Sequence, residues 1–168
     1  MVLISVIIPY YNNSDTIKRA LASVYIQSEQ NFEILLINDA SPDWIIAEQE
    51  IALFNKEKLR ILHHEFNKNG AAARNTGIKA AQGDYVAFLD ADDEWTSDHL
   101  KYSTETFRKT NADLVFSKSQ VFSSFNYILP TNGLKPKEKI VDYIFYRKQA
   151  IFTSTIVVKT AVAKQILF

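Results

Sequence analysis

Four short apolar runs, each followed by a segment with helical spacing, constrain the fold of this chain most strongly. The runs are rich in Val, Ile and Leu, as expected of strands that are buried on both faces. They occupy residues 3–11, 32–39, 58–64 and 84–90. The helical patterns occupy residues 12–28, 42–55, 68–83 and 96–111. Because strands that alternate with helices form right-handed crossover units, the pattern predicts an α/β fold with a mainly parallel sheet and helices on both of its faces.

The pattern changes after Asp113. Residues 112–129 predict one or two strands, one of them antiparallel, and residues 131–149 predict turns and a short helix. Residues 152–168 predict a further strand and the opening of a helix. At 168 residues and without a linker, the chain is expected to form a single domain, residues 1–168. Because it stops at Phe168 without a helix-ending signal, we expect a C-terminal truncation of a longer protein.

The composition excludes several classes of function. Lys and Arg together number 19, as do Asp and Glu, so the formal net charge is zero. This balance argues against a nucleic-acid partner that is bound through bulk positive charge. The absence of cysteine excludes disulfides, thiolate metal sites and a cysteine nucleophile. The apolar runs are too short to cross a bilayer and the N-terminus lacks the basic start of a signal peptide, so a cytoplasmic location is expected.

Polar residues follow three of the predicted strands. Ligands of open parallel α/β sheets bind beyond the carboxyl ends of the strands. Asn12, Asp39 and the acidic residues 90–94 follow the first, second and fourth strands, and Arg74 begins the helix before the fourth. The sequence therefore predicts a ligand site along this edge of the sheet.

The acidic segment DADDE, which begins at Asp90, places four carboxylates within five residues. Like charges this close disfavour one another's ionisation. A divalent cation such as Mn²⁺ or Mg²⁺ would offset the repulsion, because hard cations prefer carboxylate oxygens. Asp90 and Asp92 lie two residues apart and share one face of an extended segment. The alternative is a negatively charged N-terminus of the next helix, whose dipole favours Asp93, Glu94 and Asp98.

Two interpretations also stay open for other residues of this edge. Asp39 either accepts a hydrogen bond from a base or a sugar, or forms an Asx turn before Pro42. Arg74 lies in the first turn of a predicted helix, where its guanidinium and the backbone N–H groups suit a diphosphate. The alternative is that Arg74 is a surface residue that pairs with a nearby carboxylate. Tyr10 and Tyr11 are both of a type that stacks on a nucleobase. Because aromatic side chains at strand ends more often belong to the core, only one of the two is expected to face the ligand.

The three histidines are assigned structural roles. His63 and His64 end the third strand without a metal-ligand partner at helical spacing, and His99 is alone on a predicted helix. The chain also lacks the glycine-rich motifs of P-loop and dinucleotide-binding proteins.

Taken together, four stretches of the chain resemble family 2 glycosyltransferases. They are SVIIPYYNNSDTIKRALASVYIQS, FEILLINDASPD, NGAAARNTGIKAAQGDYVAFLDADDEW and TSTIVVKTAVAKQILF, in this order. The resemblance implies a GT-A fold and sugar transfer with inversion from a nucleotide-sugar donor, with UDP as the expected nucleotide. It also implies a divalent metal, a carbohydrate or lipid-linked acceptor, a role in polysaccharide biosynthesis, and peripheral association of the full-length enzyme with the inner face of the membrane.

The resemblance assigns the base-binding part of the site by position. Pro9, Tyr10 and Tyr11 match the segment that surrounds the uracil and ribose. Asp39 matches the second acid of the family's Asp-Asp pair, which hydrogen-bonds the base. This chain departs from the pattern on both sides of Asp39, since Asn38 replaces the first acid and Ala40 replaces the usual glycine.

The phosphate and metal part is assigned in the same way. Arg74 matches the family's Ala-Arg-Asn element near the diphosphate. Asp90 and Asp92 match the D-x-D motif, with Asp92 as the direct metal ligand and Asp90 nearer the ribose.

The family's catalytic base normally lies in a Glu-Asp element downstream of residues 153–158, and no such element precedes Phe168. The resemblance therefore implies that this chain holds the donor half of the site and has little or no transferase activity. Two alternatives are a non-catalytic nucleotide-sugar-binding module and a haloacid-dehalogenase-like phosphatase. The phosphatases place a D-x-D motif after their first strand, whereas here it follows the fourth.

Overall fold

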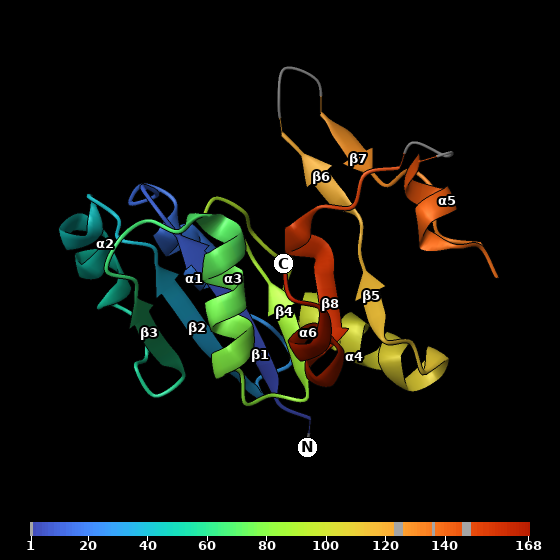
Figure 1. Ribbon diagram of the computed structural model, residues 1–168, viewed down its shortest axis with the longest axis horizontal. Coiled ribbons are helices and arrows are strands. Elements are labelled where there is room, and N and C mark those ends of the chain that lie inside the picture. Colours follow the sequence, from blue (N-terminus) through green and yellow to red (C-terminus); the bar gives the residue numbers. More distant parts are fainter. Residues whose placement is uncertain (1, 123–125, 136, 146–148) are drawn as a thin grey trace.

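A six-stranded sheet forms the centre of the computed structural model, which describes residues 2–122, 126–135, 137–145 and 149–168. The strands lie in the order β3-β2-β1-β4-β8-β5 (Figure 1). They are β1 (Ile4–Tyr10), β2 (Phe32–Asn38), β3 (Leu59–His63), β4 (Tyr85–Phe88), β5 (Leu114–Phe116) and β8 (Ile156–Lys159). Strands β1 to β4 are parallel, and β8 runs antiparallel to β4 and β5. The predicted mainly parallel sheet is therefore confirmed.

Helices cover both faces of this sheet, as the sequence predicts. They are α1 (Ile17–Tyr25), α2 (Trp44–Ile51), α3 (Asn69–Ala80), α4 (His99–Thr110) and α6 (Thr160–Ile166). Alternate residues of β1 point to opposite faces. Val6 and Ile8 pack in the core cluster that includes α1, α2 and α4, whereas Ile7 packs in the cluster that includes α3 and α6. The two layers enclose β1, β2 and β4, whereas β3 is an edge strand in which only Leu59 is buried.

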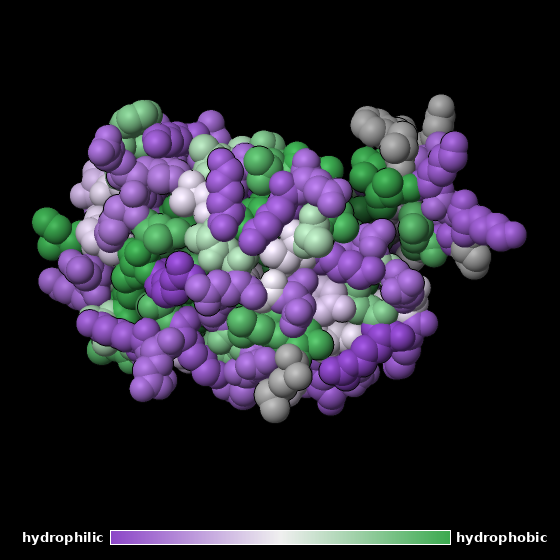
Figure 2. Space-filling view, turned by 60° about the horizontal axis from the view of Figure 1, so that its bottom comes forward, coloured by the Kyte–Doolittle hydropathy of each residue, from purple (hydrophilic) through white to green (hydrophobic). Residues whose placement is uncertain are grey.

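The segment between β5 and β8 projects from the main body (Figure 1). The projecting part contains β6 (Ser119–Val121), β7 (Tyr127–Leu129) and α5 (Ile140–Phe145), and the chain then returns to the main body through the short helix η1 (Thr153–Thr155). The expectation of one or two strands over residues 112–129 is wrong in number, because this segment forms three short strands. Hydrophobic atoms gather at the projecting end, whereas hydrophilic side chains cover most of the face in Figure 2.

Helix α3 lies unusually close to the sheet at Gly77. A Cβ atom at this position would come within 2.5 Å of the Ile7 side chain, closer than packed atoms tolerate. Only glycine therefore lets α3 lie this near to β1, and Arg74 lies one turn earlier on the same helix.

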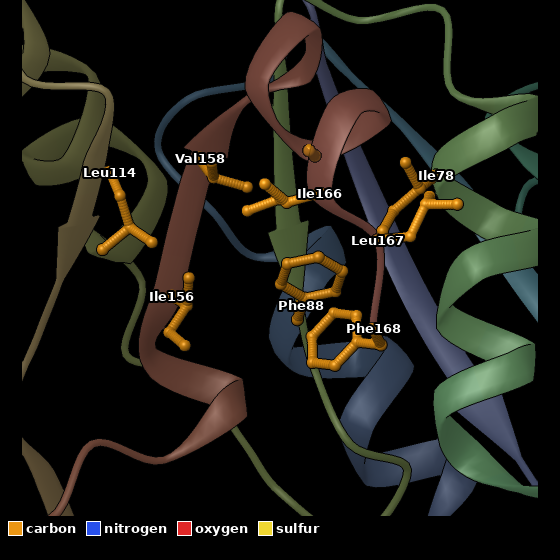
Figure 3. A pocket seen from close by; sticks show the side chains of 9 residues that line it. Ile78, Phe88, Leu114, Ile156, Val158, Ile166, Leu167 and Phe168 are labelled. Carbon is orange, nitrogen blue, oxygen red and sulfur yellow. The ribbon is translucent and has the colours of Figure 1, made fainter.

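An apolar cavity of about 160 Å³ lies between α3, α6 and strands β4, β5 and β8 (Figure 3). All of its lining side chains are hydrophobic, among them Phe88 and Phe168, whose rings meet edge to face at 5.2 Å. It offers no group for acid–base or metal chemistry. Within the described part of the chain, no helix combines the length and the apolar composition needed to cross a membrane.

His99 is a buried histidine at the start of α4. Its ring stacks on Trp95 with the ring centroids 4.4 Å apart, and it is 7% exposed. Burial lowers its pKa to about 4, because the protonated ring would lose its hydration.

We expect His99 to make the fold less stable in acid. The unfolded chain binds a proton at His99 near pH 6.5, whereas the folded chain does not until about pH 4. The contribution of His99 to the free energy of unfolding is complete above pH 6.5. It decreases by about 3 kcal/mol as the pH falls toward 4. Urea unfolding at pH 7.5 and 4.5 should show a smaller pH-dependent loss in His99→Phe than in the unaltered chain. An equal loss in both proteins would contradict this assignment.

Candidate functional site

A polar cleft of about 220 Å³ lies at the carboxyl ends of β1, β2 and β4, beside the first turns of α3. Its lining consists of Pro9, Tyr10, Tyr11, Asn13, Asp39, Gly70, Ala73, Arg74, Asp90, Ala91 and Asp92. All seven residues that the sequence predicts as binding or metal-ligating line this one cleft. They come together because parallel strands deliver the residues that follow them to the same edge of the sheet. The structure thus confirms where these residues lie, and their roles remain predictions.

Asp90 and Asp92 face different surroundings. The Asp90 carboxylate forms an ion pair with Arg74, as the alternative interpretation of Arg74 expects, but the Arg74 side chain is only 16% exposed. The Asp92 side chain is exposed, and its carboxylate makes no hydrogen bond or ion pair to any residue that the structure describes. Asp92 is therefore the carboxylate of the D-x-D motif that remains available to a ligand.

The other two acids of the segment are bound to side chains from distant parts of the chain. Asp93 Oδ2 accepts a hydrogen bond of 2.5 Å from the Ser154 hydroxyl, and Glu94 forms an ion pair of 2.7 Å with Arg19 of α1. Helix α4 begins only at His99, and no side chain caps it. The helix N-terminus interpretation is therefore wrong for Asp93 and Glu94, whereas Asp98 does lie at the N-cap position of α4. Asp90, Asp93 and Glu94 are thus engaged by other residues of the protein, whereas Asp92 is exposed.

Ser154 is a contributor to the site that the sequence did not single out. Its hydroxyl oxygen also accepts a hydrogen bond of 3.0 Å from the Asp90 N–H, and its carbonyl accepts one of 2.6 Å from Trp95 Nε1. Loss of solvation raises the pKa of Asp93, the Ser154 hydrogen bond opposes this, and the charges of Asp92 and Asp90 add to it. Ser154 thereby fixes both ends of the D-x-D-D turn.

Asp39 is buried beneath the cleft and is held on one side only. Its Oδ1 accepts the Lys68 N–H at 2.9 Å and contacts His64 Nδ1 at 2.6 Å. Its Oδ2 is buried and has no hydrogen-bond partner among the described residues. The Asx-turn interpretation of Asp39 is wrong, because the Oδ1 that accepts the Ser41 N–H, at 2.9 Å, belongs to Asn38. Asn38 thus shapes the turn, and Asp39 keeps a free acceptor.

A second unpaired polar atom lies on the other side of the cleft. Arg74 Nε is buried and lacks a hydrogen-bond partner in the described ranges, although the guanidinium pairs with Asp90. Buried polar groups are normally hydrogen-bonded. An orphaned acceptor at Asp39 and an orphaned donor at Arg74 are features of a site that completes its hydrogen bonds with a ligand.

The two tyrosines after β1 differ in exposure. Tyr10 is fully buried and packs edge-on against Trp44, with ring centroids 5.6 Å apart. Burial and the nearby Asp43 carboxylate raise the pKa of its hydroxyl. Tyr11 is 47% exposed, so it is the aromatic side chain of this pair that is free to stack on a ligand.

Comparison with known proteins is consistent with this geometry. The model of the family described as glycosyl transferase family 2 matches residues 5–166. The chain belongs to glycosyltransferase family 2. The family assignment decides against the phosphatase alternative.

Among the family's curated members, the amylovoran biosynthesis glycosyltransferase AmsB of Erwinia amylovora is 35% identical over 98% of this chain and 58% of AmsB. The Escherichia coli protein WfgD is named as a UDP-Glc:α-D-GlcNAc-diphosphoundecaprenol β-1,3-glucosyltransferase. It is 32% identical over 73% of this chain and 47% of WfgD. This chain therefore spans about half the length of the curated relatives that it matches.

Solved glycosyltransferase structures share the fold. Residues 1–349 of Staphylococcus aureus TarS superpose with a TM-score of 0.81 at 26% identity, over 98% of this chain and 50% of that one. The same TarS segment with bound UDP-GlcNAc gives a TM-score of 0.77 over 48% of its length. The GT-A fold implied by the resemblance is thereby confirmed.

The departure from the family pattern at Ala40 has a structural cost. Ala40 has a φ of 54°, in the left-handed region where glycine is favoured because it has no Cβ. The glycine that the family usually places here would relieve this strain directly after Asp39.

We expect Ala40→Gly to raise the free energy of unfolding by about 0.5–1 kcal/mol, since the strain relieved exceeds the entropic cost of glycine. Denaturant unfolding measures the change. Ala52→Gly is the matched control, because Ala52 is exposed with a φ of −62° and should lose about 0.5–1 kcal/mol. Destabilisation by both substitutions would refute strain at Ala40.

Proposed function

We propose that the cleft binds the nucleoside diphosphate of a UDP-sugar, and that this chain is the donor-binding part of an inverting glycosyltransferase. The observation that carries the proposal is the pair of orphaned buried groups, Asp39 Oδ2 and Arg74 Nε, on the lining of one cleft. Asp39 supplies an acceptor for a base N–H, and Arg74 supplies a donor for a phosphate oxygen. Tyr11 is free to stack on the base.

The known relatives support a UDP-sugar donor. TarS has been solved with UDP-GlcNAc, and the name of WfgD specifies UDP-Glc and a diphosphoundecaprenol-linked acceptor. By analogy, we propose a carbohydrate or lipid-linked acceptor for the enzyme that contains this chain. We also propose that this enzyme acts at the inner face of the membrane. AmsB, named for amylovoran biosynthesis, supports a role in polysaccharide assembly.

The residues of the D-x-D motif fit a divalent cation that is shared with the donor. Magnesium-type sites in enzymes usually combine one or two carboxylates with substrate phosphates. Asp92 offers a free carboxylate and Asp90 lies two residues away, and the described residues contain no cluster of three or more acidic, histidine or cysteine side chains that could hold a metal alone. When bound, Mn²⁺ or Mg²⁺ would act as a Lewis acid toward the departing diphosphate.

The chain's own residues account for donor binding in the proposed reaction. Arg74 neutralises phosphate charge while its ion pair with Asp90 fixes the guanidinium. Asp39 and Tyr11 orient the base and thereby the sugar. Inversion requires an acceptor hydroxyl to attack the anomeric carbon from the side opposite the nucleotide, and none of the described residues is assigned as the base that would deprotonate it.

Calorimetric titration with UDP, with and without Mn²⁺, tests the proposal. We expect Mn²⁺ to tighten UDP binding by about tenfold or more, because Asp92 and the diphosphate would both supply oxygen ligands to the ion. Asp92→Asn should abolish this effect. It should leave the free energy of unfolding unchanged or slightly higher, because it removes one of four crowded negative charges.

Asp93→Asn is the matched control. Asp93 is engaged by Ser154 and not by the cleft, so this variant should keep the Mn²⁺ effect. UDP binding that ignores Mn²⁺ in the unaltered chain would overturn the metal role of Asp92. No UDP binding under either condition would overturn the proposed function.

A further inference from the structure

We propose that His64 is a positioning residue for base recognition, which holds Asp39 by Oδ1 so that Oδ2 is presented to a ring N–H of the nucleobase. This inference rests on the proposed function and adds a determinant of base specificity to it. His64 does not line the cleft and acts through Asp39.

The contact between His64 and Asp39 is buried and short. Nδ1 of His64 lies 2.6 Å from Asp39 Oδ1, and the two side chains are 7% and 3% exposed. The Lys68 N–H donates to the same oxygen at 2.9 Å. An ionised carboxylate only accepts hydrogen bonds, so Nδ1 is the donor in this contact. Two donors on Oδ1 leave Oδ2 as the acceptor for a ligand.

The opposite nitrogen of the ring is also held. Nε2 of His64 lies 2.8 Å from the Thr76 hydroxyl on α3, and Thr76 Oγ1 is within 3.1 Å of the Ala72 carbonyl. With both nitrogens engaged, the imidazole cannot rotate without losing two hydrogen bonds in a buried place. The His64 ring therefore connects Asp39 to α3, the helix that carries Arg74.

The clamp has a consequence for the ligand. A carboxylate oxygen accepts hydrogen bonds and does not donate them, and the contacts at Oδ1 leave Oδ2 as the oxygen that a base meets. Uracil presents an N3–H at the edge where cytosine presents a bare N3 acceptor. Uracil completes the orphaned hydrogen bond, whereas cytosine places a lone pair against a carboxylate. Asp39, held in this orientation by His64, thus separates two bases of similar size and shape.

Paired substitutions at His64 distinguish this role from a purely structural one. The amide nitrogen of Asn occupies the place of Nδ1, whereas that of Gln occupies the place of Nε2. His64→Asn therefore keeps the donor to Asp39, and His64→Gln keeps only the group near Thr76. The readout is the ratio of UDP to CDP affinity by calorimetry at one pH and one Mn²⁺ concentration.

We expect the unaltered chain to prefer UDP over CDP by about tenfold or more, the effect of one hydrogen bond to a charged group. His64→Asn should keep most of this preference, and His64→Gln should lose it by at least about fivefold through weaker UDP binding. A merely structural role would weaken UDP and CDP equally and leave the ratio unchanged. An unchanged ratio in His64→Gln would overturn the inference while leaving UDP binding, and so the proposed function, intact.

Thr76 provides a second pair of variants in case the His64 variants do not fold, which thermal unfolding would reveal. Thr76→Val removes the hydroxyl at nearly constant shape, and Thr76→Ser keeps it. We expect Thr76→Val to lower the UDP-to-CDP ratio and Thr76→Ser to preserve it. Equal ratios in the two variants would overturn the clamp, and failure of the unaltered chain to bind UDP would overturn the proposed function itself.

Discussion

The ion pair between Arg74 and Asp90 is the interaction on which the site most depends. It joins the first turns of α3 to the segment after β4 and so connects two sides of the cleft. The Arg74 side chain is 16% exposed and the Asp90 side chain 32%, so leaving the guanidinium, the more buried of the two charges, unpaired would be costly. The pair forms because Gly77 lets α3 approach β1, which brings Arg74 down to the level of the strand ends. Packing of one helix thus determines where the positive charge of the cleft lies.

The fold follows from the sequence because its signals are local and repeated. Each apolar run has the length and composition of a buried strand, and each is followed by a helical segment. The gathering of Asp39, Arg74 and Asp90 is predictable for the same reason, since parallel strands place their carboxyl ends together. The region after β5 was harder to predict, because three-residue strands such as β6 and β7 have too few residues for a clear alternation.

The partners of the predicted residues were less accessible from the sequence. Ser154 lies 61 residues from Asp93, and no periodicity connects them. For His64 a signal did exist, because Asn38 and His63 are paired in register at the ends of β2 and β3. Asp39 and His64 are therefore the first residues beyond two neighbouring strands. That signal depends on knowing the strand ends to the residue, which sequence patterns do not provide.

The position of β8 has a consequence for the order in which the site is assembled. Strand β8 lies between β4 and β5, and η1 immediately before it carries Ser154. During synthesis, β1 to β4 emerge from the ribosome first and can pair with one another, but the second edge of β4 stays open until β8 has emerged. The acidic turn acquires its anchor at that same moment. The nascent chain therefore becomes competent to hold a charged ligand only once β8 has paired with β4.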